Sequence, residues 1–332
     1  MGRRPHHPRR GSLGFSPRKR ATKSNPRIKS WPKEERTRIQ GFSGYKVGVT
    51  NVLTLDDYKN SLTYGEDVNV VATVIETPPL VICGARLYGE GTNGLKILAE
   101  TWIDDLDKDL GRVFPMPKKI QGHLKDLEKN LDKGKEIRVI THTQPREVRG
   151  TPRKKPEIAE YKISGSLPKA MDYVKGVLGK KLKVKDIFEE GEFIDTISIT
   201  KGKGFQGPVK RWGVKILPRK TRKGRRTAGT LGPWHPAAMM WRSPQGGQVG
   251  FHQRTEYNKM ILKIGDNGDD INPKGGSLRY GFVNGDYMVL KGSVAGPRKR
   301  LIKMRAAIRP TRIIPEGKPY VSHINLESKQ GN

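Results

Sequence analysis

Sixty consecutive residues, 196 to 255, contain no aspartate or glutamate, yet they carry thirteen lysines or arginines. They are rich in glycine and proline, and strand patterns flank them on both sides. So long an acid-free segment, rich in glycine and proline, is improbable as a loop that supports itself. We therefore predict a basic extension that leaves a folded core between two strands and works inside a partner.

The partner is predicted to be a polyanion, because the positive charge extends over the whole chain. The 332 residues include 65 Lys and Arg against 33 Asp and Glu, a formal net charge of +32. A compact fold with that charge repels itself, and nucleic acid is the usual source of counter-charge. Residues 1 to 33 hold eleven basic and no acidic residues, so we expect this arm to be disordered alone and to fold on its partner.

Three of the five tryptophans, Trp212, Trp234 and Trp241, lie in the acid-free segment. Basic side chains contact phosphates and aromatic rings stack on unpaired bases, a combination that favours RNA over duplex DNA. A carboxylate inside folded RNA would be repelled and desolvated at a cost, which accounts for the missing acids. A merely solvated basic loop would leave the tryptophans unexplained.

Cysteine and apolar content narrow the class of protein. The single cysteine, Cys83, lies in an apolar run and is expected to be a small buried side chain. It excludes a disulfide framework and a cysteine-rich zinc site. No apolar run approaches the ~20 residues that span a bilayer. We expect a soluble cytoplasmic protein without cofactor, metal, membrane span or small-molecule substrate.

Strand patterns predominate in the core. Tyr45, Val47 and Val49 alternate with other residues, which predicts a half-buried strand, and the apolar runs 68–75 and 80–87 predict strands buried on both faces. Prolines at 78 and 79 mark a break between the two. Further strands are predicted at 136–141, 157–164, 193–200, 257–264, 286–291 and 301–307. In the last, Lys303 and Arg305 alternate with apolar residues and are expected to face a phosphate backbone.

Two helices are predicted as insertions. After Pro117, one apolar stripe is formed by Ile120, Leu124, Leu127 and Leu131. The second runs from Leu167 to Leu178, between start signals at 166 and 168 and a glycine stop at 179. The fold class is therefore mainly β (α+β). The number and spacing of strands favour a closed antiparallel β-barrel, because closure removes exposed edges.

Enzymatic motifs are weak. Residues 202–207 match G-x-G-x-x-G, but no helix is expected after Pro208, and the acid ~20 residues on that a dinucleotide site needs is missing. His235 and His252 lie in the segment without acids, which offers no carboxylate of its own to orient either one. The acidic loop 266–270 lacks the glutamate of an EF-hand and is interpreted as a turn.

Two functions of other classes stay open on these patterns. A DNA-compacting protein would share the charge, but it would not concentrate tryptophans in an acid-free loop. An RNA-modifying enzyme would need a cofactor or metal site that the sequence does not offer.

Four runs carry a resemblance to a known family: RGSLGFSPRKR from Arg10, TKGKGFQG from Thr200, GPWHP from Gly232 and KGSVAGPRKR from Lys291. In this order they resemble the ribosomal protein L-three family of the large subunit, in its archaeal and eukaryotic branch, over essentially the whole chain. The family's lysine-threonine-histidine stretch, whose histidine is commonly methylated in eukaryotes, reads Lys220-Thr221-Arg222 here, so that modification is not expected.

The resemblance implies a barrel of the translation-protein type, direct binding to large-subunit (23S-type) rRNA, a role in early assembly, and an extension tipped by Trp234 toward the peptidyl transferase centre. The implied partners are this rRNA and neighbouring large-subunit ribosomal proteins. The implied division is a basic rRNA-binding arm (1–41), the first part of the barrel core (42–200), the extension (201–255), the rest of the core (256–309) and a tail (310–332).

The residues expected to bind rRNA are the basic, tryptophan and histidine residues of these arms and of the run at 298–300. They are Arg3, Arg4, Arg9, Arg10, Arg18, Lys19, Arg20, Lys201, Lys203, Lys210, Arg211, Trp212, Arg219, Lys220, Arg222, Lys223, Arg225, Arg226, Trp234, His235, Trp241, Arg242, Arg254, Arg298, Lys299 and Arg300. No catalytic residue is predicted.

Overall fold

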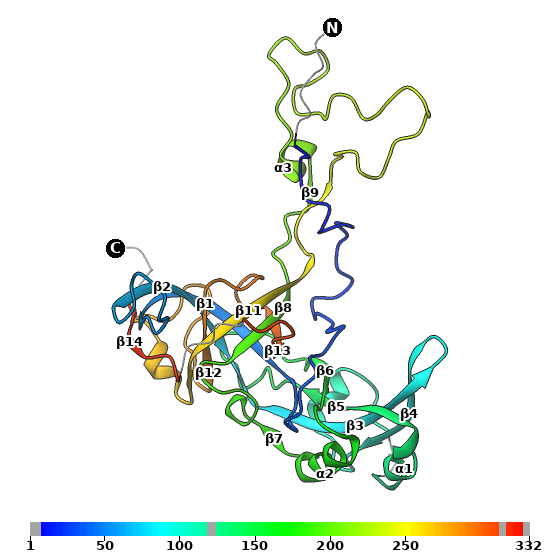
Figure 1. The fold of residues 1–332 in the computed structure, drawn as a ribbon, viewed down its shortest axis with the longest axis vertical. Helices are drawn as coiled ribbons and strands as arrows, with labels where there is room; N and C mark the ends of the chain where they lie inside the picture. The colour runs from blue at the N-terminus through cyan, green and yellow to red at the C-terminus, as the bar shows by residue number, and fades with distance from the viewer. Residues whose placement is uncertain (1–7, 118–123, 312–316, 328–332) are drawn as a thin grey trace. The chain divides into compact units, whose positions relative to one another are not determined.

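The computed structural model describes residues 8–117, 124–311 and 317–327, and its fold is mainly β with few helices. The chain divides into two compact units. The extension unit consists of Met1–Ser24 and Ile199–Arg254, and the body of Asn25–Ser198 and Thr255–Asn332. Both units are drawn in Figure 1.

The larger sheet of the body has seven strands in the order β13-β8-β11-β12-β2-β1-β14, and β13 also pairs with β1. The strands are β1 (Gly41–Leu55), β2 (Asp67–Glu76), β8 (Phe193–Ile199), β11 (Gln253–Gly265), β12 (Tyr287–Lys291), β13 (Leu301–Ala306) and β14 (Val321–Ile324). The long strand β1 pairs with β13 through its first five residues and with β2 from Tyr45 onward. The pairings of six strands therefore return to their starting strand.

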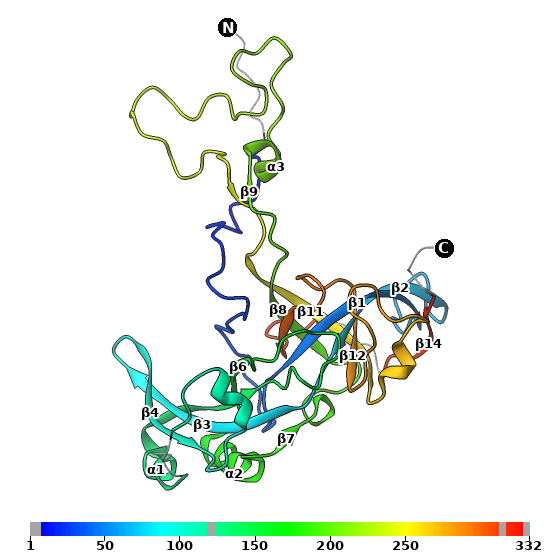
Figure 2. The same cartoon turned by 180° about the vertical axis from the view of Figure 1, so that it is seen from behind.

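The second sheet of the body has five strands, in the order β4-β3-β5-β6 with β7 beside β3. These are β3 (Leu80–Gly91), β4 (Gly94–Trp102), β5 (Gly134–His142), β6 (Ile158–Lys162) and β7 (Lys181–Leu182). The helix α1 (Leu124–Lys129) packs against β4, and α2 (Leu167–Val177) packs against β5, as seen from behind in Figure 2. Within the described part of the body, four short 3-10 helices lie between strands: Lys108–Arg112, Leu131–Lys133, Val184–Asp186 and Gly268–Ile271.

Beside a small third cluster that contains Cys83 and Ile140, two large apolar clusters form the core of the described body. One lies within the larger sheet and contains Tyr45, Val52, Leu262 and Val289. The other joins β3, β5 and α2 to residues of β8 and β13. Burial of both clusters removes the apolar faces of the two sheets from water, which is the main stabilising term of such a fold. Cys83 is fully buried, as expected, and burial raises the pKa of its thiol to about 12.

The predicted strands are all present, but two details of their burial differ. Val49 is exposed rather than buried, because a bulge between Lys46 and Gly48 shifts the register against β2 and reverses which residues face inward. The first half of β2 is open to solvent on one side, where half of the Val71 surface is exposed. The strands β4 and β14 were not predicted, nor were the two-residue strands β7, β9 (Phe205–Gln206) and β10 (Gly247–Gln248).

The prediction that Lys303 and Arg305 face a phosphate backbone is wrong, since both are buried. Arg305 donates to the buried Asp195 carboxylate at 3.0 Å and to the carbonyl of Ser30 at 2.6 Å. The segment that precedes β1 covers this face of β13. Buried charges need such partners. The alternation of residues predicted the strand correctly, but it could not show that another segment of the chain covers the second face of the strand.

The second helix begins and ends near its predicted residues. In α2, Ala170, Met171 and Val174 are buried, and Gly179 ends the helix with a positive φ of 78°. The first helix is shorter than its apolar stripe, because Leu131 lies in a separate 3-10 helix. Ile120 lies outside the described residues.

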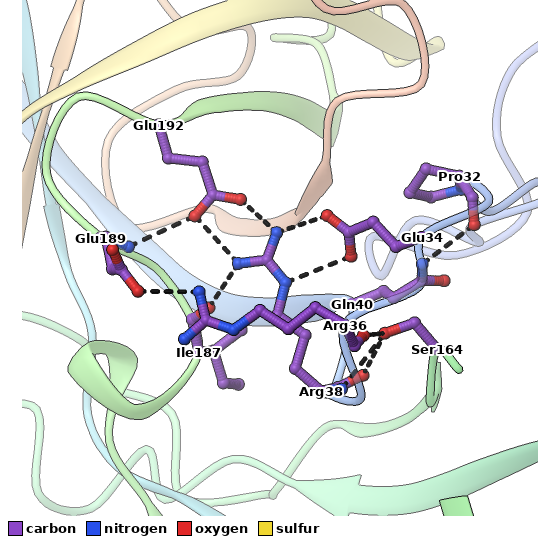
Figure 3. A network of polar contacts seen from close by, with 9 residues as sticks. All are labelled: Pro32, Glu34, Arg36, Arg38, Gln40, Ser164, Ile187, Glu189 and Glu192. Carbon is purple, nitrogen blue, oxygen red and sulfur yellow. Dashed lines mark hydrogen bonds and ion pairs between the residues drawn. The ribbon is translucent and has the colours of Figure 1, made fainter. Parts of the chain in front are cut away.

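An arginine with two carboxylate partners ties the segment before β1 to the turn before β8 (Figure 3). Arg38 forms ion pairs with Glu34 and Glu192, and its Nη1 donates to the carbonyl of Ile187 at 2.9 Å. Its side chain is only 9% exposed. The neighbouring Arg36 pairs with Glu189 at 2.8 Å, but its side chain is 67% exposed.

This contrast gives a first prediction. Replacing Arg38 with alanine leaves two carboxylates without their cation, and should lower the free energy of unfolding by about 3 to 5 kcal/mol. The matched change Arg36→Ala removes an exposed pair and should cost less than about 1 kcal/mol. Urea unfolding of the two variants measures both values. Equal losses would show that the network does not hold the segment.

A second prediction concerns Lys303. Burial lowers the pKa of its amino group to about 8, although the negative charges of Glu157 and Glu160 raise it in part. An unfolded lysine has a pKa of about 10.4, so between these values the unfolded state binds more protons and stability rises with pH. Between pH 7 and pH 10, wild type should gain about 2 kcal/mol relative to Lys303→Met. Denaturant unfolding of both proteins at the two pH values isolates this residue, and a constant difference would contradict the prediction.

Candidate nucleic-acid interface

Charge is divided unequally between the two units. The 80 residues of the extension unit include 21 Lys and Arg and no Asp or Glu. The 252 residues of the body include 44 Lys and Arg and 33 Asp and Glu. Of the net charge of +32, the extension unit therefore carries +21. Its side chains cannot neutralise one another, so its cations require an anion from outside the unit.

A short helix in the extension unit sets the position of Trp212. The helix α3 (Pro208–Trp212) begins with a proline at its first turn and ends at Gly213, whose φ of 69° lies in the left-handed region. The expectation of no helix after Pro208 is therefore wrong, because these two residues suffice to start and stop one turn. The Trp212 side chain is 7% exposed, and its Nε1 donates to the carbonyl of Gln245 at 2.7 Å.

The N-terminal arm packs on Trp212. The guanidinium carbons of Arg18, Arg211 and Arg9 lie 4.1, 5.4 and 5.7 Å from the ring centroid, within the range of cation–π attraction. Gly11 approaches so closely that a Cβ there would lie 2.5 Å from the indole. The prediction that Trp212 offers a free face to RNA bases is wrong, since its ring is covered by the arm.

Further contacts continue this packing along the arm. Arg254 lies 4.9 Å from the ring of Phe15, and Arg20 lies 5.3 Å from the ring of Phe251. His252 is buried, and its Nδ1 lies 2.8 Å from the carbonyl oxygen of Lys19. The role of His252 in these contacts is structural. The sequence prediction missed Phe15 and Phe251, although aromatic residues within basic runs were a visible signal of stacking.

The remaining predicted residues of the extension unit are exposed. Trp234 is 87% exposed and Trp241 is 70% exposed. Large exposed apolar surfaces are common where proteins bind their partners. The exposed basic residues and histidine are Arg9, Arg10, Lys19, Arg20, Lys201, Lys203, Lys210, Arg219, Lys220, Arg222, Lys223, Arg225, Arg226, His235 and Arg242. Arg3 and Arg4 lie outside the described residues.

The predicted residues of the body lie in the loop before β13 and are half-buried. Arg298 donates to the carbonyl of Leu278. The backbone N–H of Lys299 donates to the carbonyl of Lys46 at 2.8 Å. Burial lowers the pKa of Arg300, and the positive charge of the nearby Arg153 lowers it further. These contacts shape the loop, so the body residues are less free to meet phosphates than those of the extension unit.

The described residues lack two other kinds of feature. They contain no cluster of three or more His, Cys, Asp or Glu side chains that could hold a metal ion. No helix in this part of the chain has the length and apolarity to cross a membrane.

Comparison with known proteins decides the family. A family model described as Ribosomal protein L3 matches residues 1–331. The chain belongs to the ribosomal protein L3 family. It is 50% identical over 329 residues to the large ribosomal subunit protein uL3 of Archaeoglobus fulgidus, covering 98% of this chain and 99% of that one. The uL3 protein of Methanococcus aeolicus is 50% identical, and the match covers 100% of both chains. The uL3 protein of Methanopyrus kandleri is 47% identical, and the match covers 99% of this chain and 93% of that one.

Membership in the L3 family confirms the resemblance in the sequence. It makes the chain a structural ribosomal protein of the translation machinery rather than an enzyme. The dinucleotide motif at 202–207 and the two alternative functions, DNA compaction and RNA modification, are thereby set aside.

The contacts of Trp212 give a third prediction. Replacing Trp212 with alanine removes a buried ring, worth about 3 kcal/mol or more, and should free the arm. Limited trypsin digestion of the isolated protein should then cleave after Arg18, Lys19 or Arg20 about tenfold faster than in wild type. The control Trp234→Ala removes an exposed ring and should leave the rate unchanged. If both variants were cleaved at the wild-type rate, Trp212 would not hold the arm.

Proposed function

We propose that this chain is a structural constituent of the large ribosomal subunit and binds large-subunit (23S-type) rRNA directly through its extension unit. The names of its relatives, large ribosomal subunit protein uL3, support the assignment to that subunit. The single observation that carries the RNA-binding part is the +21 charge of an 80-residue unit without any acid.

Charge neutralisation supplies the binding free energy in this proposal. Each Lys or Arg that meets a phosphate releases condensed counterions, which favours association without reading any base. The arginine and lysine residues at 219–226 are exposed, and apart from the bond that Arg225 donates to the carbonyl of Leu217 at 3.3 Å, their side chains can approach phosphates directly. Phosphate backbones that repel one another can then pack closely, which is how the protein would stabilise rRNA tertiary structure and support early assembly.

The exposed tryptophans add contacts to bases. Unpaired bases stack on aromatic rings with about 1 to 3 kcal/mol each. Trp234, within the run GPWHP, is proposed as the tip that reaches toward the peptidyl transferase centre, with His235 beside it.

The body serves as the anchor. We propose that its six-strand circuit is the closed barrel of the translation-protein type, because β13 pairs with both β8 and β1. The proposed division is an arm at 1–41, core at 42–200 and 256–309, an extension at 201–255 and a tail at 310–332. Neighbouring large-subunit proteins are the expected protein partners, and the ribosome in the cytoplasm is the expected location.

Sedimentation tests this function. Lysate of the source cell is fractionated on a density gradient in high salt, and the protein is followed by mass spectrometry. It should stay with the large subunit, because multiple buried phosphate contacts resist salt better than surface contacts do. Recovery only in the soluble fractions would contradict the proposal.

A fourth prediction concerns the extension itself. Deleting residues 218–242 removes exposed residues and no part of the body core, so the thermal unfolding of the body should not change. Large subunits that carry the deletion should mature or translate poorly. A second variant replaces the same residues with a glycine–serine linker of equal length and should fail in the same way, because the lost function lies in the charges and rings. Normal assembly and translation by either variant would refute the role of the extension.

A further inference from the structure

A hollow of about 610 Å³ lies within the extension unit, between the N-terminal arm, α3 and the segment that leads into β10. Its lining includes Arg18, Arg211, Trp212, Met239, Met240 and Trp241. The volume falls in the range of about 300 to 1,000 Å³ that is typical of sites for small organic ligands. It is large enough for a nucleobase with its ribose.

One side of the hollow is apolar and open to solvent. Met239, Met240 and Trp241 are each about half exposed or more. The two methionine sulfur atoms accept contacts from Gln245 and Arg242, which keep their side chains in place. Thioethers and an indole ring pack well against a flat aromatic surface, and neither demands a particular hydrogen-bond pattern.

The other side is positively charged. Arg18 donates to the carbonyl of Arg211 at 2.7 Å, and Arg211 donates to the carbonyls of Gln245 and Gln248. These bonds fix both guanidinium groups but neutralise no charge, because their acceptors are backbone carbonyls. Burial lowers the pKa of Arg211, and the positive charge of the neighbouring Arg18 lowers it further, as expected where two cations are held close together.

A ligand that satisfies both sides must combine a planar apolar face with a nearby anion. A nucleotide has both. An acidic peptide offers the anion but carries few flat rings, and a free phosphate would leave the apolar side wet.

We propose that this hollow receives one unpaired, everted base of RNA, packed against Met240 and Trp241, with an adjoining phosphate beside Arg18 and Arg211. The inference rests on the proposed function and deepens it. It makes the arm and the extension a joint nucleotide site, in addition to a charged surface. Packing against Met240 and Trp241 and a phosphate contact with Arg18 and Arg211 read no base edge, so the site should accept any base.

The test uses the full-length protein and two labelled probes of equal length and charge. One is a ten-nucleotide oligoadenylate, and the other is the same ribose–phosphate chain without bases. Binding is measured by fluorescence anisotropy at one fixed salt concentration. Wild type should bind the oligoadenylate about tenfold more tightly than the abasic chain.

The double variant Met240→Ala, Trp241→Ala changes no charge. It should bind the abasic chain as wild type does, while its preference for oligoadenylate falls to about twofold. The control Met116→Ala removes an exposed methionine of the body and should keep the full preference.

The outcomes separate the two proposals. If the double variant keeps the tenfold preference, the base binds elsewhere, at Trp234 for example, and the nucleotide site is refuted. If wild type binds both probes equally, only charge acts, which refutes the site and leaves rRNA binding intact. If neither probe binds, the proposed function fails together with the site.

Discussion

The structure depends on the confinement of carboxylates to one part of the chain. In the body, two buried arginines have acidic partners: Arg305 has Asp195, and Arg38 has Glu34 and Glu192. The extension unit has no acid with which to build such pairs. Its internal packing instead uses arginines over aromatic rings and bonds to backbone carbonyls, which order the chain but leave its charge in place. The same residues can therefore give the unit a shape and still attract a polyanion.

The sheet of the body explains where the extension begins and ends. The chain leaves the body at the end of β8 and returns along β11, and these two strands are neighbours in the larger sheet. Strand pairing thus brings together two points of the sequence more than fifty residues apart. A long segment inserted at such a point begins and ends at neighbouring strands, so it does not disturb the core of the body. The body can therefore fold although the inserted segment has almost no core of its own.

Sequence periodicity predicted most strands and both longer helices because it records burial. It failed where burial depends on distant segments. Val49 faces outward because of a bulge, and Lys303 lies inside because other segments of the body cover β13. The hairpin of β3 and β4 could have been found from Asn93-Gly94, a frequent turn pair, but the exposed residues of β4 hide its pattern. Among the site residues, composition singled out the basic unit, yet it could not tell buried Trp212 from exposed Trp234 and Trp241.

The salt dependence of binding to large-subunit rRNA transcribed in vitro tests the central claim most directly. Two variants are compared, each with five exposed cations changed to glutamine. One carries changes in the extension unit at Arg219, Lys220, Arg222, Lys223 and Arg225, and the other in the body at Lys96, Lys108, Lys125, Lys129 and Lys169. The first should make the slope of log affinity against log salt shallower by about 3 to 4, and the second by less than about 1. Equal changes in slope would show that the separation of charge does not direct RNA binding.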